Sequence, residues 1–294
     1  MKLSLLVPGL FPEIPDQDIP RLPVLETLLA KGDLRFHEKP LMLEDWSESG
    51  ERSPLSLTRA GALGLGGEGR SWLCADPVHF HVEGDGLLLL DSHSFVVSPE
   101  EAEALVGALN AHFSQDGLHF HQVLPTQWVV SLDWAPQATT THPLRRVGRS
   151  IDGYLPQGPQ ARRWRALINE VQMLLHEHPV NLAREARGER TINGVWFWDT
   201  PMGRHDARVL DLLRGPSAYG DGPGWAQAAR VVEAEHLAPL VASLRAGQLE
   251  VLDLVALEGR CTATLTLKRS HFRRFWRARH ALQDLSGVPP LEHA

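Results

Sequence analysis

The chain has 294 residues, of which 43% are hydrophobic and 22% charged, enough for a globular protein with a sizeable core. Its net charge of −7 is spread along the sequence, which excludes a broadly basic protein that binds nucleic acid or an anionic membrane. The sequence shows no secretion signal, no run that would span a bilayer, and only two cysteines, Cys74 and Cys261. We therefore expect a cytoplasmic protein whose thiols stay reduced.

The first predicted elements are a strand, a loop and a helix. An uninterrupted apolar run over 2–7 predicts a buried strand. Several prolines then favour an extended loop, and apolar residues at helical spacing predict a helix over 24–31 that ends at Gly32. The segment 44–70 is polar and rich in glycine, so we interpret it as a connection that leads to a domain boundary near residue 70.

Residues 71–149 have the pattern of a small α+β module. The dipeptide Asp85-Gly86 is a hairpin signal, and Ser98, followed by Pro-Glu-Glu, predicts the start of a helix that runs to about residue 113. Strands are predicted over 72–81, 87–90 and 127–134.

The rest of the chain alternates between helices and strands. The clearest helix is predicted over 160–178, where apolar residues recur every three or four positions and Pro179 follows as a stop. Further helices are predicted over 225–246 and 270–285, and strands over 191–198, 249–257 and 261–267. This alternation predicts an α/β fold.

Two groups of motifs carry a resemblance to a known family. The run Ala-Asp-Pro-Val-His at 75–79, and the segment from Asn169-Glu170 to Asn181, resemble the bacterial RpfE-type regulatory proteins, which are related to the archaeal-type cofactor-independent phosphoglycerate mutases. A second group begins with Leu-Pro-Gln-Gly at 155–158 and continues to the Val-Trp-Phe-Trp run at 195–198.

The resemblance implies a particular division of the chain. Residues 1–70 and 150–294 would form a shortened alkaline-phosphatase-like α/β core, and residues 71–149 would form the inserted α+β module. In the enzymes of this family the first strand ends in an acidic metal ligand followed by glycine, whereas this chain has Pro8-Gly9. Ser53 and Ser56 fall near the position of the phosphate-accepting serine, and the late Asp and His-His ligand region has no recognisable counterpart.

These departures bear on catalysis. Transfer of a phosphoryl group needs metal ions that neutralise its oxygens and activate the attacking hydroxyl. The resemblance therefore implies a pseudoenzyme, that is, a non-catalytic regulatory or ligand-sensing protein, with no catalytic residue, metal ligand or cofactor assigned. Two alternatives stay open: an active metal-dependent phosphoryl-transfer enzyme with rearranged ligands, and a protein-interaction scaffold.

Five polar residues are candidates for a retained ligand site, namely Asp76, His79, Asn181, Arg184 and Asn193. An Asp-His pair can orient a base or hold an anion, and amides with a guanidinium can bind a carboxylate or phosphate. The structural alternatives are a turn contact for the first pair and a buried polar network for the other three. The partners we expect are a small phosphorylated or carboxylate ligand and a protein, with no nucleic acid and no membrane.

Several histidines have spacings that can be compared with those of metal ligands. His79 and His81, like His119 and His121, would share one face of a strand, but no flanking carboxylate or cysteine pattern supports a metal site. His178 lies at the end of the predicted helix, where we expect it to pack against the negative helix terminus.

Two aromatic segments have structural interpretations. Trp196 and Trp198 share a strand face and are interpreted as core residues. The basic stretch 268–279, which contains Phe272, Phe275 and Trp276, is interpreted as an amphipathic terminal helix and not as a nucleic-acid site.

Overall fold

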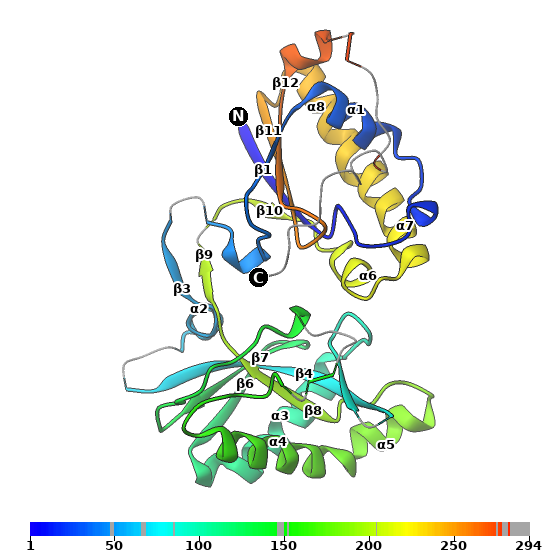
Figure 1. Ribbon diagram of the computed structural model, residues 1–294. Coiled ribbons are helices and arrows are strands. Elements are labelled where there is room, and N and C mark those ends of the chain that lie inside the picture. The colour runs from blue at the N-terminus through cyan, green and yellow to red at the C-terminus, as the bar shows by residue number, and fades with distance from the viewer. Residues whose placement is uncertain are drawn as a thin grey trace. The chain divides into compact units, whose positions relative to one another are not determined.

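The chain folds into two compact units. A computed structural model describes residues 1–47, 50–65, 69–84, 86–145, 150–151, 153–203, 205–274, 276–277 and 282. Unit 1 consists of Met1–Glu51 and Gly203–Ala294, and unit 2 consists of Arg52–Met202, so unit 2 is an insertion in the sequence of unit 1 (Figure 1). The chain passes into and out of unit 2 through β3 (Arg52–Pro54) and β9 (Pro201–Gly203), which pair as a two-stranded sheet.

A mixed sheet forms the centre of unit 1. Its strand order is β10-β1-β11-β12-β2. β1 (Lys2–Pro8) is parallel to β10 (Arg208–Val209) and to β11 (Val251–Leu257), whereas β12 (Ala263–Lys268) is antiparallel to both β11 and β2 (Asp33–Phe36). Leu5, Leu6 and Val7 are fully buried, which confirms the buried strand predicted from the apolar run.

Helices pack on this sheet and complete the core of unit 1. They are α1 (Pro23–Lys31), α6 (Arg214–Ala218), α7 (Gly222–Val231) and α8 (Ala238–Ala246), with a π-helical turn at Val232–Leu237 and 3-10 turns at Asp16–Asp18, Leu43–Asp45 and Arg269–Arg273. Trp225 of α7 donates its indole N–H to the carbonyl oxygen of Gly9 at 2.8 Å. Gly9 has a φ of 76°, and a Cβ there would lie 2.6 Å from the carbonyl oxygen of Leu213, so the turn after β1 requires glycine.

Unit 2 is an antiparallel sheet whose helices α3, α4 and α5 lie on one side of it (Figure 1). The strand order is β5-β4-β7-β6, and β8 pairs with β4. The strands are β4 (Ser71–Glu83), β5 (Gly86–Leu90), β6 (Leu118–Leu124), β7 (Gln127–Leu132) and β8 (Gly194–Trp198). The helices are α2 (Leu55–Ala62), α3 (Pro99–Phe113), α4 (Ala161–His176) and α5 (Pro179–Ala186), with 3-10 turns at Ser114–Asp116 and Pro143–Arg145.

The inserted unit is wider than the 71–149 expected from the sequence. β8 pairs with β4, with Ala75 opposite Phe197, and Trp164 of α4 belongs to the same buried cluster as β4. Residues 150–202 therefore share a core with the expected module. The boundaries at 52 and 202 follow from this packing, which no local pattern in the sequence indicates.

Other differences from the expected elements have local causes. The segment 44–70 is not only a connection, because α2 forms within it and buries Leu55, Ser56 and Ala60. Pro179 follows the end of α4 as expected, but it also occupies the first turn of α5, a position that proline favours. Part of the helix expected over 270–285 is the 3-10 turn Arg269–Arg273, and Phe275 and most of the later residues, like Asp85 of the hairpin, lie outside the described residues.

Two further observations concern the environment of the chain. In the described parts of the chain no helix is long and apolar enough to cross a lipid bilayer. The two cysteines, Cys74 and Cys261, are both buried.

Candidate functional site

One arginine and two glutamates form a buried ion cluster in unit 1. Arg214 begins α6, Glu258 directly follows β11, and Glu44 lies in the 3-10 turn Leu43–Asp45. Nε and Nη2 of Arg214 each donate to a carboxylate oxygen of Glu258 at 2.7 Å, and Nη2 also donates to Glu44 Oε1 at 3.0 Å. Arg214 is only 9% exposed, and both glutamate side chains are equally well buried. We call this the Arg214 cluster.

The Arg214 cluster lies at the edge of the sheet where ligands commonly bind. β10, β1 and β11 are parallel, and Arg214 and Glu258 come from the segments that follow β10 and β11. In open α/β sheets the crevice beyond the carboxyl ends of parallel strands is the usual binding site. Glu258 has a φ of 53°, the single positive value for a non-glycine residue among those described, and such strain is typical of functional positions.

Electrostatics keep the arginine charged in this position. Burial by itself would lower the pKa of Arg214, but attraction by Glu258 and Glu44 and the hydrogen bonds to Glu258 raise this pKa above its usual value. Glu258 is fixed in turn, because its carboxylate accepts the N–H of Leu43 at 2.7 Å. The cluster therefore holds a permanent cation between carboxylates, an electrostatic role that a divalent metal ion has in carboxylate sites. These three residues were not predicted from the sequence as a site.

The two serines near the phosphate-accepting position have different environments. Ser56, near the start of α2, is 0% exposed and donates its hydroxyl to Asp199 Oδ2 at 2.6 Å. Its backbone N–H donates to the other oxygen of the same carboxylate at 3.2 Å, so Asp199 secures the first turn of α2. Ser53 is exposed, and its hydroxyl lies 3.2 Å from that of Thr58.

Asp76 connects several elements of unit 2. Its Oδ1 accepts from Arg59 Nη1 at 2.6 Å and from the N–H of Trp128 at 3.1 Å, and its Oδ2 accepts from the indole of Trp198 at 2.9 Å. These three donors come from α2, β7 and β8, so the carboxylate joins these elements to β4.

His79 has a separate set of contacts. Its Nδ1 lies 2.9 Å from the carbonyl oxygen of Thr191, to which it donates. Burial lowers the pKa of His79, and the Thr191 bond partly opposes this effect. Positions three apart on a strand face opposite sides, so Asp76 and His79 are placed in different surroundings and do not act on one another as a pair.

The amides of Asn181 and Asn193 bind the backbone. Asn181 is fully buried; its Nδ2 donates to the carbonyl oxygens of Leu175 at 2.7 Å and Ile192 at 2.9 Å, and its Oδ1 accepts the N–H of Ile192 at 2.7 Å. Asn193 exchanges two hydrogen bonds of 2.7 and 3.0 Å with the backbone of Phe80 in β4. Both amides bond backbone N–H and C=O groups that would otherwise need a partner in the protein interior. These bonds support the alternative of a buried polar network.

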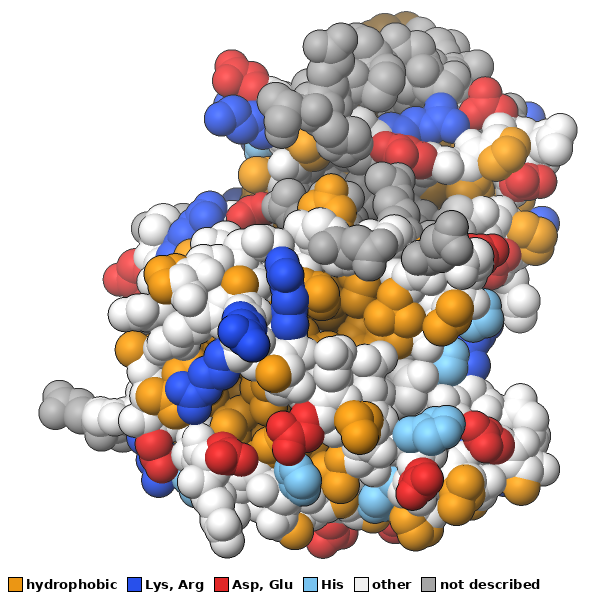
Figure 2. Space-filling model, turned by 60° about the horizontal axis from the view of Figure 1, so that its bottom comes forward, with side chains coloured by type: hydrophobic (Ala, Val, Ile, Leu, Met, Phe, Trp, Pro, Cys, Tyr) orange, Lys and Arg blue, Asp and Glu red, His pale blue; other side chains and the backbone are white. Residues whose placement is uncertain are grey.

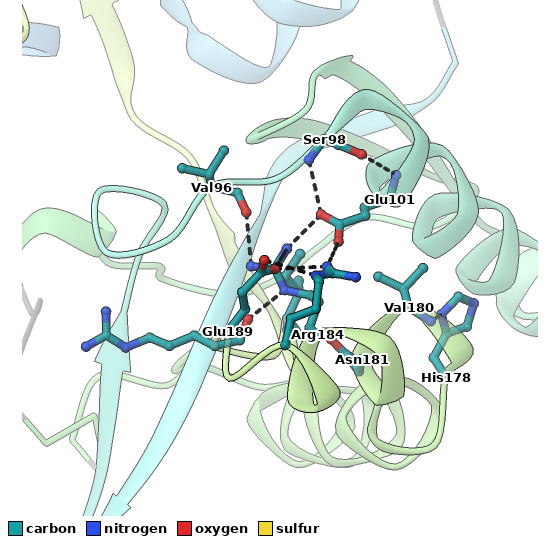
Figure 3. A network of polar contacts seen from close by, with 11 residues as sticks. Val96, Ser98, Glu101, His178, Val180, Asn181, Arg184 and Glu189 are labelled. Atoms are coloured by element: carbon teal, nitrogen blue, oxygen red, sulfur yellow. Dashed lines mark hydrogen bonds and ion pairs between the residues drawn. The ribbon is translucent and has the colours of Figure 1, made fainter.

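Arg184 joins α5 to the start of α3 (Figure 3). It is 2% exposed, and its Nε donates to the carbonyl oxygen of Arg190 at 2.6 Å. Its Nη1 donates to Glu101 Oε2 at 2.6 Å and its Nη2 to the carbonyl oxygen of Val96 at 3.0 Å. Glu101 also closes the capping box of α3 with Ser98, and this box confirms the helix start predicted from the sequence. The structure thus brings Arg184 and Asn181 together on the buried side of α5, and both bind the protein itself.

The histidines with spacings typical of metal ligands have other contacts. The rings of His79 and His81 stack at 6.1 Å, but the residues described above include no group of three or more His, Cys, Asp or Glu side chains that would hold a metal ion. His178 contacts the C-terminal end of α4 as expected, but through its backbone N–H, which donates to the carbonyl oxygen of Leu175 at 3.2 Å. Its ring does not: Nδ1 accepts the N–H of Val180 at 3.2 Å and so caps the start of α5.

The two aromatic segments have structural contacts. Trp196 and Trp198 are both buried in the core of unit 2, as expected, and the Trp196 indole donates to the carbonyl oxygen of Thr141 at 2.7 Å. In the basic stretch, Arg274 donates to the carbonyl oxygen of Lys31 at 2.9 Å and pairs with Asp33. These contacts hold Arg274 at the C-terminal end of α1.

Fold and site together define a mixed α/β protein with an arginine-centred ion cluster at the carboxyl edge of its parallel strands. The sequence model of the 2,3-bisphosphoglycerate-independent phosphoglycerate mutase family matches residues 75–181, which lie in unit 2. Through this segment the chain is related to the cofactor-independent phosphoglycerate mutases.

Curated relatives with this name come from Methanosarcina species. The protein from Methanosarcina mazei is 28% identical over 167 residues, which cover 50% of this chain and 42% of the relative. The protein from Methanosarcina barkeri is 29% identical over 140 residues, which cover 42% of this chain and 35% of the relative. The chain therefore spans less than half the length of the curated relatives it matches.

Two solved structures are similar across nearly the whole chain. The PH0037 protein from Pyrococcus horikoshii is 10% identical with a TM-score of 0.50, and the match covers 98% of this chain and 92% of that one. A cofactor-independent phosphoglycerate mutase from Thermoplasma acidophilum is 14% identical with a TM-score of 0.41, over 98% and 95% of the two chains. At this identity, the likeness to the Pyrococcus protein concerns the fold alone.

Proposed function

We propose that this protein is a non-catalytic regulatory or ligand-sensing member of the phosphoglycerate-mutase-like proteins, of the RpfE type, with an alkaline-phosphatase-like core in unit 1. The observation that carries the proposal is the Arg214 cluster. It places an internal guanidinium between two carboxylates at the edge of the sheet where a catalytic centre would be expected.

A guanidinium and a metal ion differ in what they do for phosphoryl transfer. Both neutralise negative charge, but a metal ion also lowers the pKa of a bound hydroxyl or water and so generates the nucleophile. Arg214 has directed N–H donors that are already bonded to Glu44 and Glu258, so it supplies no such activation. Within the cluster, the positive charge of Arg214 is balanced by the carboxylates of Glu44 and Glu258.

The environment of Ser56 supports the same proposal. A hydroxyl that accepts a phosphoryl group must reach its donor, yet Ser56 is fully buried and bonded to Asp199. Pro8-Gly9 at the end of β1 supplies no carboxylate, which is consistent with a non-catalytic role. A cytoplasmic location is part of this proposal, because the sequence has only two cysteines and both are buried.

The names of the curated relatives favour a second candidate, an active metal-dependent mutase with rearranged ligands. The thermal unfolding midpoint of the purified chain, measured with 3-phosphoglycerate and with and without Mn²⁺, separates the candidates, because a ligand that binds the folded state raises the midpoint. A rise that requires Mn²⁺ would favour the enzyme and contradict the proposal.

The other two outcomes refine the proposal. A rise with 3-phosphoglycerate alone supports a sensor of a small phosphorylated or carboxylate ligand. The absence of any rise supports regulation through a protein partner without a small ligand.

A further inference from the structure

Three arginines lie in the first two turns of α4. Arg162, Arg163 and Arg165 are all exposed, and residues 161–169 contain no Asp or Glu. In the described part of the chain, none of the three guanidinium groups has a carboxylate within 4.0 Å. The first acidic residue along the helix is Glu170, which binds His112 of α3 at 2.8 Å. In a protein with a net charge of −7, this is a local concentration of unneutralised positive charge.

This arrangement is unfavourable for the helix itself. The N-terminus of a helix carries a partial positive charge, so cations there are repelled, and Gln160 at the N-cap makes no capping hydrogen bond with its side chain. The guanidinium of Arg163 is held in place, since its central carbon lies 3.6 Å from the ring centre of Trp134. The basic start of α4 is therefore ordered at Arg163, and no carboxylate among the described residues pairs with its arginines.

An apolar side chain continues the same face of α4. Ala166, Asn169 and Met173 follow Arg162 at helical spacing, and Met173 is 76% exposed. The distance from Arg162 to Met173 along the helix is about 16 Å, or about three turns. Figure 2 shows Lys and Arg side chains beside exposed apolar side chains on the face of unit 2 that is turned forward. We call this surface, made of Arg162, Arg163, Arg165, Ala166, Asn169 and Met173, the α4 face.

We propose that the α4 face is a docking surface for an acidic amphipathic segment of a partner protein. Carboxylates of the partner would meet the three arginines, and an apolar side chain about three helical turns away would cover Met173, a residue that adapts to different partners. The inference rests on the proposed regulatory function, which it deepens by naming the class of partner.

The same observations favour a protein over a nucleic acid. Single-stranded nucleic acids bind through bases that stack on aromatic rings, but Arg163 already covers one face of Trp134 and Trp164 lies 5.4 Å from that ring. A short acidic segment with apolar residues is complementary to the positive charge of the three arginines and to the exposed side chain of Met173.

The test uses a fluorescein-labelled peptide that repeats Glu-Glu-Leu-Ala, with fluorescence anisotropy as the readout. The test variant combines Arg162→Glu, Arg163→Glu and Arg165→Glu. The matched control combines Arg35→Glu, Lys39→Glu and Arg230→Glu, which changes the net charge equally at exposed positions of unit 1. We expect the test variant to lose at least about tenfold in affinity and the control to stay within about twofold.

Loss of folding is not expected, because the glutamates that replace Arg162 and Arg163 lie in the first turn of α4, where a negative charge is stabilising. Circular dichroism of both variants checks this point. Met173→Ser should weaken binding without changing its dependence on salt, whereas the arginine variant should flatten that dependence. Equal binding by the two triple variants, tighter binding of a single-stranded oligonucleotide, or no binding of the peptide by the unaltered chain would each overturn the proposal. None of these results depends on phosphoglycerate or metal, so they are separate from a failure of the proposed function.

Discussion

Two arginines are buried in the described part of the chain, one in each unit, and they differ in what they bind. Arg184 in unit 2 donates to two backbone carbonyl oxygens and one carboxylate, and so fastens segments of chain to α5. Arg214 in unit 1 donates to the carboxylates of Glu44 and Glu258, at the carboxyl edge of the parallel strands. In unit 2 the buried arginine therefore connects segments of the backbone, whereas in unit 1 it neutralises two buried carboxylates.

The largest effect is expected from Arg214→Met. This change leaves Glu44 and Glu258 buried without their partner, and breaking a buried ion cluster in this way costs about 3–5 kcal/mol of unfolding free energy. Denaturant unfolding gives the free energy, and hydrogen exchange of peptides from unit 1 locates the loss.

The matched control restores the charge balance. Adding Glu44→Gln and Glu258→Gln to Arg214→Met removes the unpaired charges, so we expect most of the lost stability to return. A single variant that loses less than about 1 kcal/mol would show that the cluster is not a counter-ion arrangement.

Arg184→Ala should have the next largest effect, about 2–4 kcal/mol, because it leaves the carbonyl oxygens of Arg190 and Val96 without this donor and removes one of the donors to Glu101. The control is Arg187→Ala, on the same helix and bonded to the same glutamate, but exposed. We expect Arg187→Ala to leave the unfolding midpoint unchanged. If Arg184→Ala instead abolished binding of 3-phosphoglycerate at full stability, Arg184 would be a ligand residue.

Asn181→Leu should cost about 2–3 kcal/mol, since it removes a buried amide that bonds the backbone of Leu175 and Ile192. Asn193→Ala should cost less, about 1–2 kcal/mol, because Asn193 is only partly buried and bonds the single residue Phe80. Denaturant unfolding of both variants measures the difference, and the reverse order would contradict the assignment of Asn181 to the core network.

The smallest expected effect concerns pH. Burial lowers the pKa of His79, His121 and His178 in unit 2, so folding favours their neutral forms. The stability they contribute is complete above the pKa of an unfolded histidine, about 6.5, and is lost as the pH falls through the lower folded pKa. The unfolding midpoint should therefore drop between about pH 7 and about pH 5.

His178→Asn isolates one of these groups. Asparagine retains a capping oxygen for the N–H of Val180 but does not titrate, so this variant should lose less stability on acidification than the unaltered chain. Identical pH profiles would show that His178 does not contribute.

The sequence predicts elements well where the signal is local. The apolar run of β1 and the Ser98-Glu101 capping box of α3 each lie within a few residues of chain. α2 was missed because glycines surround it, and α5 because Pro179 serves equally as a stop and as a first-turn residue. Asn181 and Arg184 were identified as important polar residues, but nothing local shows that the backbone satisfies them.

The Arg214 cluster could not be predicted from local sequence patterns. Glu44 lies 170 positions from Arg214, and Glu258 lies 44 positions away, so no motif joins them. The mixed sheet of unit 1, in which β11 lies beside β1, brings them together. One signal was present: a glutamate at the end of an apolar strand and before Gly259 is a polar residue at the carboxyl edge of a sheet.

The most direct test of the account is an assay of mutase activity, in which conversion of 3-phosphoglycerate to 2-phosphoglycerate by the purified chain is followed with saturating Mn²⁺ or Co²⁺. With Arg214 bonded to Glu44 and Glu258 and with Ser56 buried, we expect no turnover above the blank. Sustained turnover that depends on the metal and is lost in Ser56→Ala would contradict the account, since it would require the ion cluster to open and Ser56 to become accessible.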